Sequence, residues 1–389
     1  MLMNFMPRCL AVLVVLGAAL AAPAVPSASA AAPSQKATSV SAGYVHSCAV
    51  TTKGKVLCWG YNANGQLGDG TTTSRTSPVA VANVGVKAKA VSSGYVSTCE
   101  VTTKGAALCW GYNSTGQLGN NTTTASLTPV PVYGLGKGVK AISVGYYHAC
   151  ALTTKGKVWC WGYNNVGQLG DGTTTQSPKP VAVAGLAKGV KAISVGYFHT
   201  CAITAKGAAK CWGNNTSGQL GDNSTTDRPS PVSAYGLNSH VKQISTGYQT
   251  TCAVTTKGKA LCWGSNTYGQ LGDGTTTNSP KPVVVSGLAK HTSVVKAGVN
   301  HTCALTTKGK ALCWGNNTYG QLGDNSVVGR LTPVAVYNLG RSTKLSLGYL
   351  HTCAVTSKKA VRCWGYNGYG ALGNGTTIDA HAPVATLGL

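Results

Sequence analysis

The fold is decided by the stretch Cys48-Ala-Val-Thr-Thr-Lys-Gly-Lys-Val-Leu-Cys58-Trp59-Gly60, which returns with small changes in seven copies along the chain. Each copy has two cysteines separated by nine residues, with a tryptophan directly after the second cysteine. Successive copies start 51 residues apart, except that the last starts 50 residues after the one before it. A fixed period of this length is typical of solenoids, propellers and other arrays. The sequence therefore predicts a repeated architecture.

The spacing inside the stretch predicts a hairpin closed by a disulfide. A three-residue turn at 52–54 places Gly54 where a left-handed backbone is needed. Counting outward from the turn pairs Val50 with Val56 and Cys48 with Cys58, and so small a disulfide loop stabilises by roughly 2–3 kcal/mol in the chain-entropy model. Zinc is the competing interpretation, but structural zinc sites favour closer pairs such as C-x2-C, so no metal is predicted. The predicted disulfides are Cys48–Cys58, Cys99–Cys109, Cys150–Cys160, Cys201–Cys211, Cys252–Cys262, Cys303–Cys313 and Cys353–Cys363.

The beginning of the chain predicts export. Residues 1–30 contain a basic Arg8, an apolar run at 9–22 and the small residues Ala28-Ser29-Ala30, as in a cleaved secretory signal peptide. A membrane anchor is the alternative, but the apolar run is shorter than the roughly 20 residues that a span requires. An oxidising compartment, extracellular or periplasmic, agrees with an even number of paired cysteines. We expect a flexible lead at 31–36 and one domain at 37–389.

Four short strands are expected in each copy. In the fourth copy the first runs through Ala192-Ile-Ser-Val-Gly196, and the second and third form the hairpin. The fourth strand is expected to begin at a proline, as in Pro333-Val-Ala-Val336, because a sheet edge tolerates the missing donor. Seven such units predict an all-β, seven-bladed β-propeller with four antiparallel strands per blade. The first and last strands are expected to lie in the same blade or in adjacent blades, which protects their edges.

The order of these residues resembles the regulator of chromosome condensation repeat. The fourth copy contains Gly196-Tyr-Phe-His-Thr-Cys201, then Lys206-Gly207, then Cys211-Trp-Gly-Asn-Asn-Thr-Ser-Gly-Gln-Leu-Gly221. WD repeats are excluded because glycine follows every repeat tryptophan, and kelch repeats because no Gly-Gly pair recurs at a fixed place. The resemblance covers the chain after residue 30 and implies a seven-bladed propeller. It implies binding or regulation, since that family includes a nucleotide-exchange factor for a nuclear GTPase, plain scaffolds, and related secreted inhibitors of β-lactamases.

Two repeated positions carry chemically active side chains. Histidines occupy the first at His46, His148, His199, His301 and His351, with Ser97 and Thr250 in the remaining copies. A metal or anion site in a central channel is one interpretation, and hydrogen bonding within each histidine's own blade is the other. The second position holds Asp69, Asp171, Asp222, Asp273 and Asp324, with Asn120 and Asn374 in two copies. Asp and Asn both bond nearby backbone in turns, so these are predicted to be turn residues.

Enzyme chemistry is not predicted. The sequence contains no Gly-x-Ser-x-Gly elbow and no Gly-x4-Gly-Lys-Ser/Thr phosphate loop. The cysteines are expected to be paired, and a carboxylate repeated around a ring is not an acid–base pair. No catalytic residue and no cofactor follow from the sequence.

The charge balance predicts an anionic partner. The formal net charge is +24, with 32 Lys and Arg against 8 Asp and Glu. Such an excess attracts wall polymers, acidic polysaccharides or extracellular DNA, although solvated hairpin tips alone would also explain it. A ring of lysines is expected on one rim of the propeller, at Lys53, Lys104, Lys155, Lys206, Lys257, Lys308 and Lys358.

Positions that differ between copies predict a recognition surface. Tyrosines stand amid small polar residues in the loop after Trp-Gly, as in many adaptable binding loops, although they could also pack between blades. They are Tyr61, Tyr112, Tyr163, Tyr268, Tyr319, Tyr366 and Tyr369. A second variable set precedes the first cysteine: Val45, Val96, Tyr147, Phe198, Gln249, Asn300 and Leu350.

The sequence thus favours a secreted, non-catalytic, monomeric scaffold for a protein partner or an anionic polymer of the cell envelope. The alternative function is that of a protein regulator, either an inhibitor of a secreted enzyme or an exchange-factor-like effector of a small GTPase.

Overall fold

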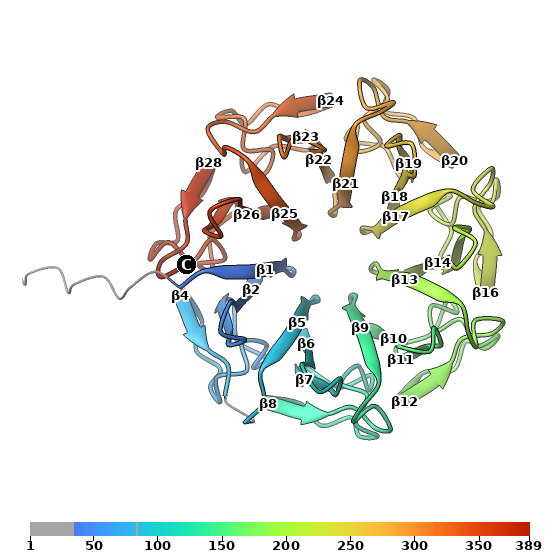
Figure 1. The fold of residues 1–389 in the computed structure, drawn as a ribbon, viewed down its shortest axis with the longest axis vertical. Coiled ribbons are helices and arrows are strands. Elements are labelled where there is room, and N and C mark those ends of the chain that lie inside the picture. Colours follow the sequence, from blue (N-terminus) through green and yellow to red (C-terminus); the bar gives the residue numbers. More distant parts are fainter. Residues whose placement is uncertain (1–34, 83–84) are drawn as a thin grey trace, which may run out of the picture. The chain divides into compact units, whose positions relative to one another are not determined.

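Seven four-stranded antiparallel sheets surround a central axis in the computed structural model, which describes residues 35–82 and 85–389 (Figure 1). Each sheet is built from four consecutive strands in chain order, with the first strand innermost and the fourth outermost. The predicted seven-bladed propeller is confirmed. The expected signal peptide at 1–30 and most of the lead at 31–36 lie outside the described residues.

The first two strands of every blade have the same length. The innermost strands are β1 (Ala37–Ala42), β5 (Ala88–Ser93), β9 (Val139–Val144), β13 (Val190–Val195), β17 (Val241–Thr246), β21 (Thr292–Ala297) and β25 (Ser342–Leu347). The second strands are β2 (His46–Thr51), β6 (Ser97–Thr102), β10 (His148–Thr153), β14 (His199–Thr204), β18 (Thr250–Thr255), β22 (His301–Thr306) and β26 (His351–Thr356).

The outer two strands complete each sheet. The third strands are β3 (Val56–Gly60), β7 (Ala107–Gly111), β11 (Val158–Gly162), β15 (Ala209–Gly213), β19 (Ala260–Gly264), β23 (Ala311–Gly315) and β27 (Val361–Gly365). The outermost strands are β4 (Arg75–Ala80), β8 (Ser126–Pro131), β12 (Ser177–Ala182), β16 (Arg228–Ser233), β20 (Ser279–Val284), β24 (Arg330–Ala335) and β28 (Ala380–Ala385).

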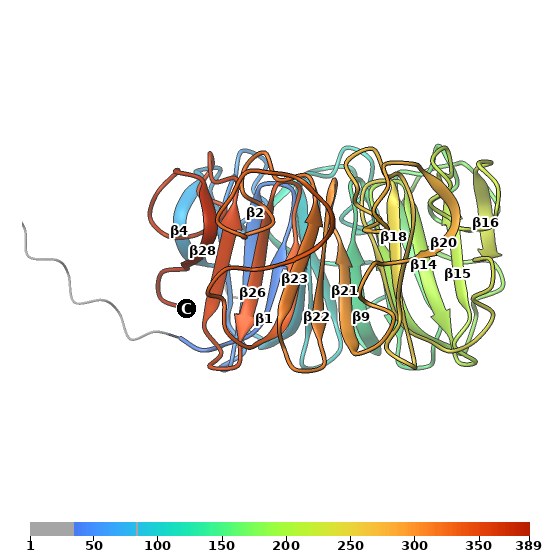
Figure 2. The same ribbon diagram turned by 90° about the horizontal axis from the view of Figure 1, so that it is seen from above.

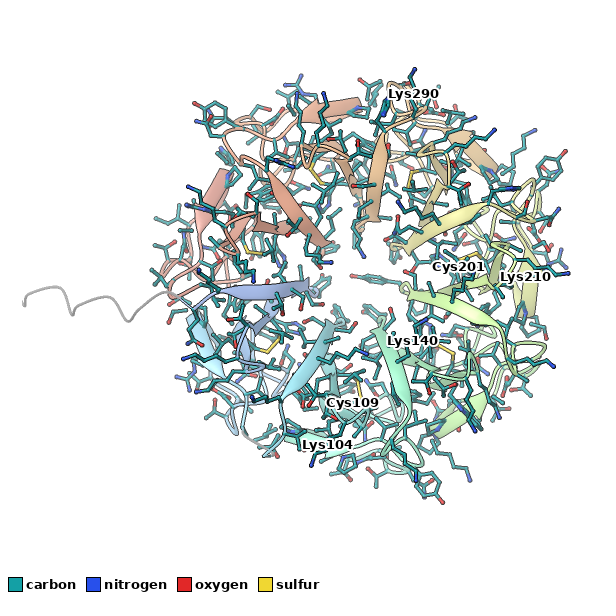
Figure 3. The ribbon with its side chains drawn as sticks, in the orientation of Figure 1. Lys104, Cys109, Lys140, Cys201, Lys210 and Lys290 are labelled. Atoms are coloured by element: carbon teal, nitrogen blue, oxygen red, sulfur yellow. A yellow bond between two sulfur atoms is a disulfide. The ribbon has the colours of Figure 1, made fainter. Side chains whose placement is uncertain are left out.

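The predicted hairpin register and all seven disulfides are confirmed. Val50 lies opposite Val56 and Cys48 opposite Cys58, and the Thr51 amide donates to the Lys55 carbonyl. The Cα atoms of the paired cysteines are 4.0–4.1 Å apart in every blade. Figure 3 shows two of these cysteines, Cys109 and Cys201, inside different blades.

The expected place of the prolines is wrong. Each outer strand starts three residues before its proline, so that Pro78 is the fourth residue of β4. The register shifts between Cys58, which lies opposite Val79, and Gly60, which lies opposite Arg75. Pro78 therefore lies within an irregular stretch of an edge strand, where its missing amide donor interrupts no regular ladder.

Tryptophans join neighbouring blades into one core. All seven repeat tryptophans are fully buried. We number the blades 1 to 7 in chain order. Trp110 of blade 2 packs into a cluster that otherwise consists mainly of blade 1 residues, including Val50 and Leu67. Its indole Nε1 also donates to the carbonyl of Gln66, which belongs to blade 1, at 2.9 Å. Each blade thus buries its apolar face against the next one.

The ring closes between adjacent blades, one of the two arrangements expected. β1 belongs to blade 1 and β28 to blade 7, so no strand is shared between the first and last parts of the propeller. The closing junction is held by the Ala37 amide donating to the Lys359 carbonyl at 2.9 Å and by Trp59 Nε1 donating to the Ala371 carbonyl at 2.8 Å.

Candidate binding site

The two ends of every blade form two different faces (Figure 2). The turn after the innermost strand (43–45 in blade 1) and the long loop before the outermost strand (61–74) lie at one end, which we call the loop face. The hairpin turn (52–55) and the linker to the next blade lie at the other end, the hairpin face. This division follows from the antiparallel order of the four strands.

A buried asparagine fixes each long loop. Asn62 donates to the carbonyls of Thr71 at 3.0 Å and Thr73 at 3.1 Å, and its own side-chain oxygen accepts from the Leu67 amide at 2.9 Å. Because one side chain holds three points of the loop, the backbone of the loop face is a rigid support. The equivalent asparagines are Asn113, Asn164, Asn215, Asn266, Asn317 and Asn367.

The aspartates are turn residues, as predicted. The Asp69 carboxylate accepts from the Thr71 amide and hydroxyl at 3.0 and 2.8 Å and pairs with Arg75 at 3.0 Å. Burial alone raises the pKa of Asp69, but hydrogen bonds from Thr71, Arg75 and Asn62 outweigh it, so the pKa lies below its usual range. A carboxylate engaged in this way stabilises a loop and is not available as a general base.

The histidines bond across blade junctions, so the expectation of bonds within one blade is wrong. His46 Nε2 lies 2.9 Å from Thr98 Oγ1 in blade 2. That hydroxyl in turn donates to the Gln66 carbonyl of blade 1, so it accepts from a protonated His46 Nε2. Burial lowers the pKa of His46 to about 3, which keeps its ring neutral. The histidines are junction residues, and in the described part of the chain no group of three His, Cys, Asp or Glu could hold a metal.

The predicted tyrosines all lie on the loop face. Tyr61 and Tyr369 come from neighbouring blades with ring centroids 4.9 Å apart, and Tyr319 and Tyr366 are 5.2 Å apart. These two pairs pack between blades, and Tyr369 is still 44% exposed. Packing and recognition, offered above as alternatives, are compatible for these side chains.

Sequence reasoning missed a second, inner ring of tyrosines at the mouth of the central channel. Neighbouring rings lie 4.0–4.8 Å apart, from a stacked pair at 4.0 Å between blades 2 and 3 to a T-shaped pair at 4.8 Å between blades 4 and 5. Val299 takes the equivalent place in blade 6. The Gly-Tyr pair that recurs in six of the seven copies, as in Gly43-Tyr44, was the available sign of this ring. Its members are Tyr44, Tyr95, Tyr146, Tyr197, Tyr248 and Tyr349.

Three shallow cavities adjoin over the inner ring, with volumes of about 360, 400 and 450 Å³. Tyr44 and Tyr95 border two of them, and Tyr147 and Phe198 also border two each. Both variable sets therefore contribute to one aromatic surface. Such a surface can contact a partner with large, rigid side chains, because tyrosine loses little conformational entropy on binding.

The hairpin face has the opposite chemistry. Every lysine of the predicted ring is exposed, and lysines follow one another around the propeller, including Lys104, Lys140, Lys210 and Lys290 (Figure 3). Of the eight acidic residues of the chain, only Glu100 lies outside the loops of the loop face. The positive charge and the aromatic surface are thus on opposite ends of the propeller.

Comparison with known proteins agrees with this geometry. The sequence pattern of the RCC1-like domain matches residues 16–240, and the regulator of chromosome condensation (RCC1) repeat matches residues 257–305 and 308–355. The chain belongs to the RCC1 repeat family. The resemblance stated from the sequence is confirmed.

Relatives in the RCC1 repeat family differ in what they do. The chain is 33% identical over 313 residues to the ultraviolet-B receptor UVR8 of Arabidopsis thaliana, covering 78% of this chain and 71% of the receptor. It is also 33% identical over 303 residues to the human E3 ubiquitin-protein ligase HERC2, covering 75% of this chain but only 6% of that protein. The relatives therefore support binding and regulation as a class, and no single activity.

Two solved structures have the same fold. Human WBSCR16 superposes with a TM-score of 0.74 at 25% identity, over 82% of this chain and 86% of that one. Prp20p of Saccharomyces cerevisiae, described with its binding to Gsp1p and histones, superposes with a TM-score of 0.75 at 23% identity, over 90% and 87%. Within residues 35–82 and 85–389, no helix is long and apolar enough to cross a membrane.

Proposed function

We propose that this RCC1-type propeller is an exported, non-catalytic binding scaffold that holds a protein partner on its loop face. The observation that carries the proposal is the aromatic surface over the central channel, supported by loops that buried asparagines hold in place. Rigid tyrosine-rich surfaces give binding energy at low entropic cost, and tyrosine is enriched at protein interfaces.

Exposed tyrosines at two different places make the proposal testable. Tyr268 and Tyr369 are 46% and 44% exposed on the loop face, whereas Tyr133 and Tyr235, at 59% and 61%, lie in linkers of the hairpin face. Tyr268→Ser together with Tyr369→Ser should weaken partner capture at least tenfold, because interface tyrosines commonly contribute more than 1 kcal/mol each. The matched pair Tyr133→Ser with Tyr235→Ser should leave capture unchanged. Equal loss from both pairs would contradict a loop-face site.

The hairpin face supports a second candidate function, namely binding to an anionic polymer of the cell envelope or to extracellular DNA. None of its lysines forms an ion pair with a carboxylate among the described residues, and Glu100, the one acidic residue outside the loop face, is buried. Lysine is a compact point charge, so such binding would be unselective and would weaken steeply with salt. Replacing all seven hairpin-tip lysines by glutamine should reduce the slope of log K against log salt, as measured by titration with wall polymer and with DNA.

A regulatory role would use the same loop face with a single tight partner. An inhibitor would lower the activity of one secreted enzyme, and an exchange effector would accelerate nucleotide release from a purified GTPase. Assays with a panel of secreted enzymes and a panel of purified GTPases would distinguish these roles from that of a plain scaffold. Export itself predicts a mature chain that begins near Ala31, which mass spectrometry of the secreted protein would detect, and a monomer by light scattering.

A further inference from the structure

Serine hydroxyls connect the innermost strands around the central channel, and this ring of hydrogen bonds is broken at one place. In six blades the last residue but one of the innermost strand is a serine. Its Oγ accepts from the amide of the final residue of the next innermost strand, at 2.8–3.2 Å. Blade 6 has Lys296 in place of this serine. The serines are Ser41, Ser92, Ser143, Ser194, Ser245 and Ser346.

The missing serine leaves a backbone donor without its usual acceptor. The amide of Leu347, the final residue of β25, points away from β26 as its equivalents do, because hydrogen bonding alternates along an antiparallel strand. The ammonium of Lys296 has donors only and cannot accept from this amide. No side chain of the described residues accepts from it. Leu347 is also partly exposed, whereas the final residue of each other innermost strand is buried.

A second lysine lies at the same junction. Lys344 is the exposed third residue of β25, where the other blades have neutral residues. Burial and the nearby positive charge of Lys344 lower the pKa of Lys296, so the two ammonium groups are close enough to repel each other. β21 and β25 are neighbours around the axis (Figure 1), and they approach each other less closely than any other neighbouring pair of innermost strands. Positive charge is therefore concentrated where the wall of the channel is loosest.

Neither lysine has a compensating partner. Among the described residues, Lys296 and Lys344 form no ion pair and no hydrogen bond. None of the seven innermost strands contains an acidic residue. Two ammonium groups and a backbone N–H at one junction are the donors of an anion site, since charge-assisted hydrogen bonds to an anion are stronger than neutral ones.

The adjacent space suits a small ion. Residues of all seven blades line a cavity of about 90 Å³ at the axis, and Ala297, Val299 and Leu347 border it on the side of this junction. A cavity of this size has room for a few water molecules or a small ion, and none for a polymer. The junction thus differs from the exposed hairpin-tip lysines, which are accessible to long polyanions.

We propose that the junction between blades 6 and 7 binds a small dianionic oxyanion of the phosphate and sulfate class, held by Lys296, Lys344 and the Leu347 amide. Two negative charges compensate two ammonium groups, and several oxygens accept from the three donors at once. A monocarboxylate would leave one ammonium group uncompensated. The site does not depend on the partner proposed for the loop face.

Titration calorimetry with the oxidised chain tests the proposal, with sulfate, inorganic phosphate and acetate as probes at one ionic strength set by sodium chloride. We expect saturable binding of sulfate and phosphate, at least about tenfold tighter than that of acetate, because a monoanion loses one charge-assisted pairing. Lys296→Ser should abolish this binding, and the variant should fold because serine is the residue of the other six blades. Sulfate should raise the melting temperature of wild type and leave that of Lys296→Ser unchanged.

A matched pair of variants separates a built site from overall charge. Lys296→Ser with Lys344→Ser should abolish sulfate binding. Lys191→Ser with Lys242→Ser removes two exposed lysines from the innermost strands of blades 4 and 5, and should leave sulfate binding unchanged. The proposal is overturned if wild type binds sulfate no more tightly than acetate, if Lys296→Ser retains sulfate binding, or if both pairs lose it equally.

Discussion

The loop face and the hairpin face differ in the environment of their polar groups. At the loop face, asparagines, histidines and aspartates are buried or half-buried and bonded to named partners, such as Asn62 to Thr71 and Thr73. At the hairpin face, lysines stand in water at the tips of tight turns. Buried polar groups depend strongly on their partners, whereas exposed charges contribute little to stability. The loop face should therefore determine the stability of the propeller, and the hairpin face its charge.

The largest effect is expected from removing a loop-face asparagine. Asn164→Ala loses bonds to the carbonyls of Thr173 and Thr175 and to the Leu169 amide. Leaving these groups without a partner should lower the free energy of unfolding by about 3–5 kcal/mol. Urea denaturation measures the change, and Asn165→Ala, at an exposed position of the same loop, serves as the control with a change below about 0.5 kcal/mol. Similar losses of unfolding free energy in both variants would contradict the view that buried polar groups of the loop face determine stability.

Glu100 is the exception at the hairpin end, and its replacement should stabilise the chain. The folded pKa of about 7 lies above the ordinary value of 4.5, so between these values the folded chain holds a proton that the unfolded chain releases. Stability is therefore lost as the pH rises from 4.5 through 7. The advantage of Glu100→Ala should grow by about 3 kcal/mol between pH 4 and pH 8. Urea midpoints at the two pH values measure it.

Glu100→Gln serves as the control, since it removes the titration and keeps the polar group in place. An advantage of Glu100→Ala that is equal at both pH values would contradict a raised pKa.

Histidines make the loop end sensitive to acid. Burial lowers the pKa of His148 to about 3 from 6.5, so below pH 6.5 the unfolded chain takes up a proton that the folded chain refuses. Stability falls as the pH drops from 6.5 toward 3, by about 1.4 kcal/mol per pH unit for each such histidine. His148→Ser introduces serine, which blade 2 has at the equivalent position, Ser97. The variant should reduce the slope of unfolding free energy against pH by the contribution of one histidine. A slope that does not change would mean that His148 titrates normally in the folded chain.

Hairpin-tip lysines should show the smallest effect. Lys155→Gln removes one exposed charge with no ion-pair partner among the described residues, and the free energy of unfolding should change by less than about 0.5 kcal/mol. Thermal unfolding at two salt concentrations checks this. A larger effect would show that charge at the hairpin face takes part in folding.

Local features of the repeat were predictable from sequence because they depend on neighbours in the chain. The Thr52-Lys53-Gly54 turn set the hairpin register and, with it, the Cys48–Cys58 pairing. The bond between His46 and Thr98 joins residues 52 positions apart and depends on how two blades meet, which no single repeat reveals. The inner tyrosine ring was missed for the same reason. Glu100 was visible in the sequence as the one charged residue at a position that holds alanine in the other six copies.

Because the ring closes without a shared strand, each blade is made from one continuous segment of the chain. The chain could therefore begin and end at a different junction. The junction between blades 7 and 1 uses the same kinds of contact as the others, with His351 Nε2 2.8 Å from Ser47 Oγ. The Gln35 amide donates to the Gly388 carbonyl at 2.7 Å, so the two ends of the propeller are adjacent. A circular permutant that joins these ends and opens the linker between β8 and β9 would retain both faces. The junction that closes the ring is thus built in the same way as the junctions inside the chain.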